Sequence, residues 1–189
     1  MYKFTKLIGA LLVISQLSGC AAAVVGGAAA GSSMAVDRRT AGAYVEDENI
    51  ELKAFKKMET NLGEESHVNV TSYNANVLLT GEVPNAELKA KAETLAKSIA
   101  GVKNITNEIV IGMKSSLTDR TNDTFITSKV KSNFLAEKDF HDHLIKIVTE
   151  ASTVYLMGIV TQKEANLAVE IARNTDGVKK VVKVFEYMP

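Results

Sequence analysis

The chain has 189 residues, of which 46% are hydrophobic and 23% charged, and its 22 basic residues balance its 22 acidic ones. A nucleic-acid partner usually requires a strongly basic face, so the balanced charge and the absence of a long basic run argue against that class. The length suits one domain or two small ones, and an internal repeat favours two.

The segment 1–19 is predicted to be a removable signal peptide. Lys3 and Lys6 form a basic region, and residues 7–14 form an apolar stretch too short to span a bilayer as a helix. Leu17-Ser18-Gly19-Cys20 then resembles the bacterial lipobox. Cys20 is the only cysteine, which suits lipidation better than a disulfide. The alternative is an ordinary signal peptide with an incidental cysteine.

We therefore expect a mature protein that begins at Cys20, which carries a diacylglyceryl group and an N-linked acyl chain such as palmitate, with no other cofactor. Ala21 follows the cysteine, and under the lipoprotein sorting rule this residue implies export to the outer membrane, with the domains in the periplasm. Residues 20–43 are predicted to be a flexible tether. A short helix lying on the membrane is the alternative for residues 21–36, although Gly26-Gly27 weakens it.

One pattern then occurs twice along the chain. The sequence VLLTGEV at residues 77–83 is matched by VYLMGIV at residues 154–160, and a helical stretch follows each copy. Gly81 and Gly158 take the same place in the two copies. Both glycines are predicted to be structural, because a side chain there would crowd a neighbouring backbone.

Each copy is predicted to fold as helix–strand–strand–helix–strand, an α+β unit with a three-stranded mixed sheet packed on two helices. The first domain is assigned to residues 44–114, a polar linker to 115–122 and the second domain to 123–189. The residues expected on the buried helix stripes are Leu52, Phe55 and Met58; Ala92, Leu95, Ala96 and Ile99; Ile126, Val130 and Phe134; and Ala168, Ile171, Ala172 and Thr175.

This pattern resembles the BON domain, a bacterial envelope module. The resemblance is closest at residues 84–88 (PNAEL), 121–127 (TNDTFIT) and 154–158 (VYLMG). The whole chain is similar to dual-BON outer-membrane lipoproteins. This similarity implies a protein without enzymatic activity that localises to the division site, maintains outer-membrane integrity and supports the barrel assembly machinery.

The first helix of the second copy carries the candidate binding face. Residues 46–113 contain seven basic and eleven acidic residues, whereas residues 124–136 contain two lysines and no acid. At about 100° per residue, Phe125 lies beside Ser128, Lys129 and Ser132, a combination that suits an anionic lipid surface. Asp123 is predicted to be the N-cap of this helix. The alternative for Phe125 is a place in the core or in a staple at the helix start.

The resemblance implies more than the helix pattern does. In this family the second BON domain binds anionic phospholipid through its first helix, and an aromatic residue inserts into the lipid. The matching positions are Phe125, Ser128, Lys129, Ser132, Asn133 and Leu135. Phe125 stands where an interfacial Trp would add an indole N–H donor. The rival hypothesis is a periplasmic adaptor that binds an assembly-machinery protein.

No catalytic constellation is found, so we predict that the protein is not an enzyme. His141-Asp142-His143 could hold a metal on a strand, but the segment precedes the strand, and a solvated loop without metal is predicted. Lys179, Lys180 and Lys183 are predicted to be the solvated side of the last strand rather than a second basic patch.

Overall fold

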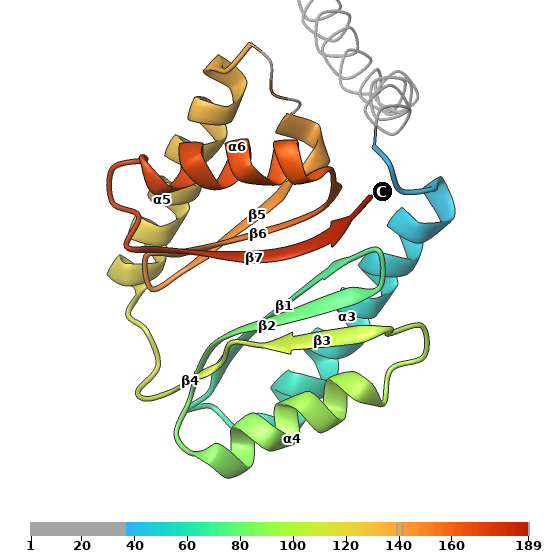
Figure 1. The fold of residues 1–189 in the computed structure, drawn as a ribbon. Helices are drawn as coiled ribbons and strands as arrows, with labels where there is room; N and C mark the ends of the chain where they lie inside the picture. Colours follow the sequence, from blue (N-terminus) through green and yellow to red (C-terminus); the bar gives the residue numbers. More distant parts are fainter. Residues whose placement is uncertain (1–36, 139, 141, 189) are drawn as a thin grey trace, which may run out of the picture. The chain divides into compact units, whose positions relative to one another are not determined.

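The computed structural model describes residues 37–138, 140 and 142–188, and the folded part of the chain, Arg38–Pro189, forms one compact unit. The predicted signal peptide, Cys20 and residues 21–36 lie outside the described residues. Within the compact unit the helix–strand–strand–helix–strand order occurs twice (Figure 1). This confirms the predicted α+β fold and its duplication.

The first domain places a mixed sheet against two helices. Strands β1 and β2 pair antiparallel, and β2 pairs parallel with both β3 and the two-residue β4. The predicted last strand is interrupted because the Ile109 N–H bonds to the Asn107 side chain and not to β2. The elements are α3 (Ala41–Leu62), β1 (His67–Tyr73), β2 (Asn76–Val83), α4 (Ala86–Lys97), β3 (Asn104–Asn107) and β4 (Val110–Ile111).

The second domain repeats this plan with an unbroken last strand. Strands β5 and β6 pair antiparallel, and β6 and β7 pair parallel over eight residues. The elements are α5 (Leu117–Ala136), the 3-10 turn η2 (Asp142–Leu144), β5 (Lys146–Glu150), β6 (Thr153–Val160), α6 (Gln162–Arg173) and β7 (Lys180–Tyr187).

Each domain has its own hydrophobic core between helices and sheet. Ile126, Val130 and Phe134 of α5 are buried as predicted, and so are the alanines of the predicted stripes on α4 and α6. The predicted stripe of α3 is wrong at two positions, because Leu52 and Phe55 are exposed. Ile50, Ala54, Met58 and Leu62 fill the core instead. These four residues are spaced four apart, but Ala54 is small and only weakly hydrophobic, so the spacing is hard to recognise in the sequence.

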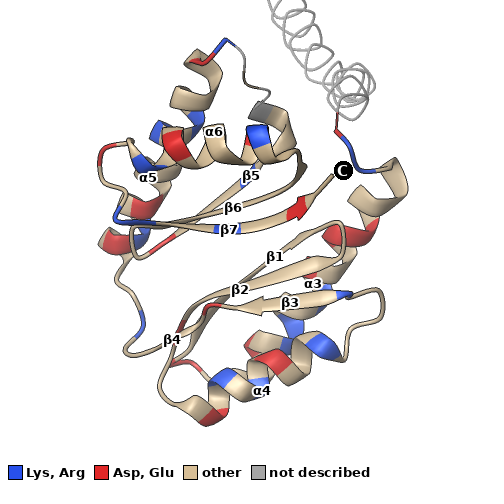
Figure 2. Ribbon diagram, viewed as in Figure 1, with Lys and Arg blue, Asp and Glu red and all other residues tan. Residues whose placement is uncertain are grey.

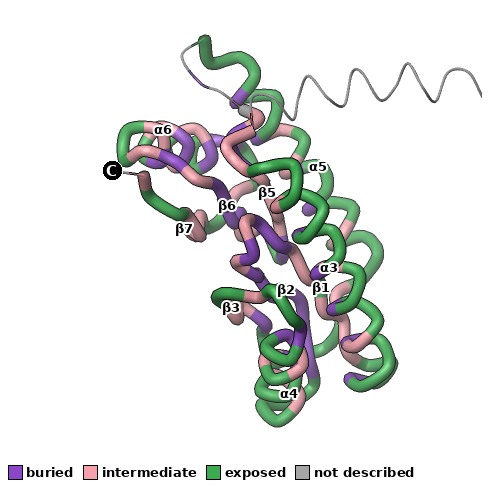
Figure 3. The backbone as a smooth tube through the Cα atoms, turned by 90° about the vertical axis from the view of Figure 1, so that its right-hand side faces the viewer, coloured by how far each residue is buried: buried purple, intermediate pink, exposed green. Residues whose placement is uncertain are grey.

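A third apolar cluster joins the two domains. Tyr73 and Leu78 of the first sheet pack with Tyr155 and Met157 of the second, and Val148, Ile159, Val182 and Val184 surround them. Successive side chains of a strand point to opposite faces, so β2 and β6 contribute alternately to their own core and to the shared cluster. Both central strands are therefore buried on both faces (Figure 3).

The first helix of the second domain begins earlier than predicted. Most of the predicted linker 115–122 is helical, because Ser116 caps α5 two turns earlier than expected and Asp119 completes a capping box with it. Asp123 is therefore not the N-cap; it lies inside α5 and is buried. The predicted tether 20–43 also ends too late, since Thr40 caps α3 and the helix begins at Ala41.

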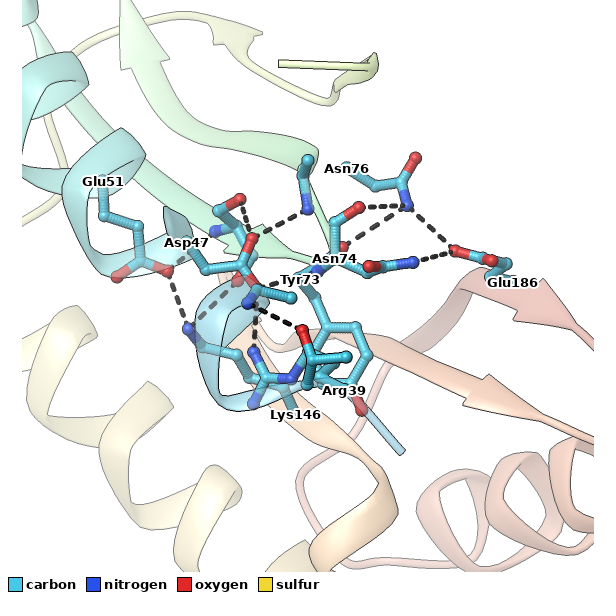
Figure 4. Close-up of polar contacts among 12 residues, drawn as sticks. Arg39, Asp47, Glu51, Tyr73, Asn74, Asn76, Lys146 and Glu186 are labelled. Atoms are coloured by element: carbon cyan, nitrogen blue, oxygen red, sulfur yellow. Dashed lines mark hydrogen bonds and ion pairs between the residues drawn. The ribbon is translucent and has the colours of Figure 1, made fainter. Parts of the chain in front are cut away.

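Two arginines bind the chain to both domains just before α3. Arg38 forms an ion pair with Glu164 of α6 at 2.7 Å and also donates to the Ile159 carbonyl at 2.8 Å. Arg39 pairs with Asp47 at 3.0 Å and lies over the Tyr73 ring, 4.0 Å from its centroid (Figure 4). Since Arg39 contacts the first domain and Arg38 the second, the segment that enters the fold helps to hold the two domains together.

The Arg38–Glu164 pair predicts a measurable pH dependence. The hydrogen bond from Arg38 lowers the pKa of Glu164 to about 2, from an ordinary value of 4.5. A lowered carboxyl pKa stabilises the fold fully above its unfolded-state pKa, and this contribution is lost as the pH falls toward the folded-state pKa. We expect the free energy of unfolding, measured in urea, to decrease as the pH is lowered from 4.5 to about 2. The decrease should be less steep in Glu164→Gln. Glu170→Gln, on the exposed side of the same helix, should show the same change of unfolding free energy with pH as wild type.

Candidate functional site

The outer face of α5 is the candidate site. Phe125 and Leu135 are 66% and 64% exposed, and Leu117, directly after the N-cap, is 76% exposed. Phe125 is therefore neither part of the core nor a staple at the helix start. Figure 3 shows exposed positions along the outer side of this helix. Leu117 escaped the prediction because the helix was expected to begin after it.

The core fixes which side of α5 faces outward. Ile126, Val130 and Phe134 recur every four residues and are almost fully buried. Phe125, Ser128, Ser132 and Leu135 are displaced from this stripe around the helix, so they point away from the sheet. Four of the six predicted binding residues thus lie together on one exposed face, which we call the α5 outer face.

Hydroxyl groups accompany the apolar side chains on this face. The Ser128 hydroxyl donates to the Thr124 carbonyl at 2.9 Å, and Thr121 and Thr124 make the same bond to the preceding turn. Because these protons are directed into the helix, the oxygen lone pairs remain as acceptors on the surface. Polar, uncharged groups beside exposed apolar ones are typical of a surface that meets lipid headgroups.

Lys129 and Asn133 lie at the margin of this face rather than at its centre. The Lys129 Nζ atom is 2.7 Å from the Asp176 carboxylate, in an exposed ion pair, and this hydrogen bond lowers the pKa of Asp176. Asn133 donates to the Thr175 hydroxyl at 2.9 Å. The helix itself carries no acid from Thr124 to Ala136, but the fold brings Asp176 to its edge. The sequence could not show this contact between two residues that lie far apart along the chain.

A shallow groove opens between the start of α5 and the loop before β7. Leu117, Thr121 and Phe125 line one side, and Asp176 and Gly177 line the other, with Lys129 between them. The groove places a cation beside two exposed apolar side chains. A phosphate could meet the lysine there while an acyl chain meets the apolar groups.

The glycines of the repeat allow a neighbouring backbone segment to approach the central strand closely. An added Cβ would lie 2.0 Å from the His67 carbonyl oxygen at Gly81, and 2.5 Å from the Leu144 carbonyl oxygen at Gly158. Gly81 also has a φ of +106°, which side chains rarely allow. This geometry supports the structural role predicted for both residues.

A buried carboxylate holds the hairpin of each domain. Asp47 accepts the backbone N–H groups of Asn74 and Ala75 at 2.8 Å, and also the Ser72 hydroxyl (Figure 4). Asn74 and Ala75 have positive φ angles, as a tight two-residue turn requires. The carboxylate thus stabilises a turn whose sequence is unfavourable for it.

Asp123 makes the same arrangement in the second domain. It accepts the N–H groups of Ala151 and Ser152 at 2.9 and 2.8 Å. Asp47 and Asp123 take equivalent places in the two copies, so the repeat itself carries the signal that the sequence interpretation missed.

Within residues 37–138, 140 and 142–188 no group of three His, Cys, Asp or Glu side chains could hold a metal ion. His141 lies outside the described residues, and η2 begins at the next position. Lys179, Lys180 and Lys183 are exposed, as expected for the solvated side of β7.

None of the described helices combines the length and apolar character needed to cross a bilayer. The most extended, α3 and α5, are amphipathic in burial and carry charged residues along their length (Figure 2).

Comparison with known proteins adds to this geometry. The BON domain family model matches residues 46–113 and 122–189, which confirms the predicted duplication. The outer membrane lipoprotein DolP of Haemophilus influenzae is 39% identical over 188 residues, covering 98% of this chain and 96% of that protein. A 21 kDa hemolysin of Actinobacillus pleuropneumoniae is 37% identical over 155 residues, covering 81% and 80% of the two chains.

Similarity to solved structures is weaker. A structure of CdsD, a structural protein of the type III secretion system of Chlamydia trachomatis, has a TM-score of 0.31 and 10% sequence identity. The match covers 75% of this chain and 93% of that one. This likeness is too low to carry an argument about function.

Proposed function

Because this chain belongs to the BON-domain family, with one copy of the domain at residues 46–113 and another at 122–189, we propose that it is an outer-membrane lipoprotein that docks on anionic phospholipid through its α5 outer face. The H. influenzae relative is an outer membrane lipoprotein by name and matches nearly the whole chain. That similarity supports the same location for this protein, and we propose that Cys20 is the lipidated residue and that the domains lie in the periplasm.

The observation that carries the lipid proposal is the exposure of Phe125 beside acceptor hydroxyls and Lys129. Phe125 is 66% exposed on a helix whose opposite side is fully packed, so the fold gains nothing from an aromatic side chain there. Burying such a side chain in acyl chains is worth about 1.5–3 kcal/mol. Added to a lipid anchor, this second contact would concentrate the protein where anionic lipid accumulates.

The ion pair at the edge of the face does not oppose this function. An exposed pair such as Lys129–Asp176 contributes between about 0 and 1 kcal/mol. Lys129 can therefore exchange the Asp176 carboxylate for a lipid phosphate at little cost. Localisation to the division site and a role in outer-membrane integrity would follow from where such lipid gathers.

Vesicle binding tests the proposal. The fragment of residues 37–189 contains both hydrophobic cores and lacks the anchor. We expect it to float with vesicles rich in phosphatidylglycerol and not with phosphatidylcholine alone, and to bind less at high salt because salt screens the charges. Phe125→Glu should weaken binding at least about tenfold, since it removes the buried apolar group and adds a like charge.

Two variants complete the test. Asp176→Asn should bind anionic vesicles more tightly than wild type, because Lys129 then lacks its competing carboxylate. Met113→Glu alters an apolar residue that is even more accessible but lies outside α5, and it should bind like wild type. Equal binding by wild type and Phe125→Glu would contradict lipid docking through this face and favour the protein-adaptor hypothesis.

A further inference from the structure

The outer side of α3 carries a second exposed apolar surface. Val45, Glu48, Leu52, Phe55 and Glu59 follow one another at alternating spacings of three and four residues, so they lie in one line along the helix. The three apolar members are 55%, 53% and 56% exposed. We call these five residues the α3 seam.

The fold of the first domain does not require this seam to be apolar. The opposite side of α3 already fills the core with Ile50, Ala54, Met58 and Leu62. At the C-terminal end of the helix the seam runs into a groove, whose lining includes Phe55, Glu59, Leu62, Glu64, His67 and Lys114. The line of exposed apolar residues therefore leads into an accessible groove, which is lined by the carboxylates of Glu59 and Glu64 together with Lys114.

The duplicated helix shows that the two outer faces have diverged. With Asp123 aligned on Asp47, the seam positions correspond in α5 to Thr121, Thr124, Ser128, Lys131 and Leu135. Phe125 corresponds to Asn49. The α3 seam has acids where α5 has none, so an anionic membrane, which repels carboxylates, is not its occupant.

The spacing and charge of the seam specify its partner. Alternating three- and four-residue steps are typical of a helix that packs lengthwise against another helix. A second copy of α3 fits poorly. Antiparallel pairing about Leu52 would set Glu48 near the exposed Lys56 but would set Glu59 against Val45, and parallel pairing would set each carboxylate against itself. Either arrangement buries at least one carboxylate without a cation, which is strongly unfavourable.

We propose that the α3 seam docks an amphipathic helix of another protein, whose apolar residues recur at heptad spacing and whose Lys or Arg side chains pair with Glu48 and Glu59. The first domain then binds protein while the second binds lipid. Lipid docking by α5 is not required for this interaction.

Photo-crosslinking in cells tests the proposal on the full-length chain. A photoreactive residue replaces exposed Leu52 in one variant and exposed Ser128 in another, and mass spectrometry identifies the crosslinked species. From position 52 we expect an adduct with a protein segment of the stated pattern. Glu48→Lys combined with Glu59→Lys should reduce the yield at least about fivefold through like-charge repulsion, whereas Glu170→Lys on α6 should not.

Each other outcome overturns the proposal. An adduct only with lipid, an adduct with a second copy of this chain, no protein adduct, or a yield that charge reversal leaves unchanged would each contradict it. Crosslinks from Ser128 report lipid docking separately, and their persistence in the charge-reversed variant shows that the chain is still folded. Failure of the α3 proposal is therefore distinguishable from failure of lipid docking through α5.

Discussion

Gly81→Ala is expected to destabilise the first domain by at least about 3 kcal/mol, which is a large fraction of the stability of a small domain. The new Cβ would lie 2.0 Å from the His67 carbonyl oxygen, and that oxygen belongs to the backbone of β1 and cannot rotate away. The φ of +106° adds strain that alanine does not tolerate. Urea unfolding followed by circular dichroism would measure the loss.

Two other glycines calibrate this result. Gly158→Ala has the same clash at 2.5 Å without a positive φ, so a smaller loss of about 2 kcal/mol is expected in the second domain. Gly112→Ala meets no atom within 4 Å and should change stability by less than about 0.5 kcal/mol. Equal effects at all three positions would show that backbone crowding is not what selects glycine in the repeat.

Removal of either hairpin carboxylate is the second large effect we expect. Asp123→Ala leaves two backbone N–H groups of the β5–β6 turn without their acceptor, in a region where Ser152 is buried. Hydrogen bonds to a charged group are worth about 1.5–3 kcal/mol each, so we predict a loss of about 3 kcal/mol. Asp47→Ala should lose about 4 kcal/mol, because Asp47 also accepts from Ser72 and pairs with Arg39.

Neighbouring substitutions separate this effect from a general loss of helix stability. Asp123→Asn keeps one acceptor oxygen and should recover part of the loss. Thr124→Ala changes the next, exposed residue of α5 and should stay within about 0.5 kcal/mol of wild type. Hydrogen exchange at the Ala151 and Ser152 amides measures the local loss of these hydrogen bonds. Unchanged protection of the two amides in Asp123→Ala would contradict the role of Asp123 in holding the turn.

The duplicated architecture could be predicted because several separate patterns in the sequence indicated the same folding unit. The apolar alternation of the strands, the alanine stripes of α4 and α6 and the spacing of Ile126, Val130 and Phe134 all indicated the same unit. The buried side of α3 was misjudged for a physical reason. A small residue fills one of its core positions, so the larger side chains of Leu52 and Phe55 dominated the pattern while facing outward.

The packing between the domains was not predicted, although its signal is present. Residues 154–160 are apolar at nearly every position, and a strand with only one covered face would alternate apolar and polar residues. The alternate members, Tyr155 and Met157, belong to the cluster shared with Tyr73 and Leu78. The local sequence pattern indicates that both faces of this strand are covered, but it does not show that the sheet of the first domain covers the second face.

The candidate site was predicted in composition but not in detail. The exposure of Phe125 and Leu135 follows from helical geometry once the buried stripe is known. The contact between Lys129 and Asp176 does not, because it depends on how the loop before β7 folds against α5. Ser116 was missed as the helix start because it lies in a polar stretch typical of a linker.

Lipid docking through the α5 outer face is tested most directly by NMR on residues 37–189, titrated with anionic and then zwitterionic micelles, for wild type and Phe125→Glu. We predict shifts confined to Leu117–Ala136 and the adjoining Asp176 loop, seen with anionic micelles only and lost in the variant. A folded fragment whose α5 amides do not move, or whose shifts fall on α3 instead, would contradict it.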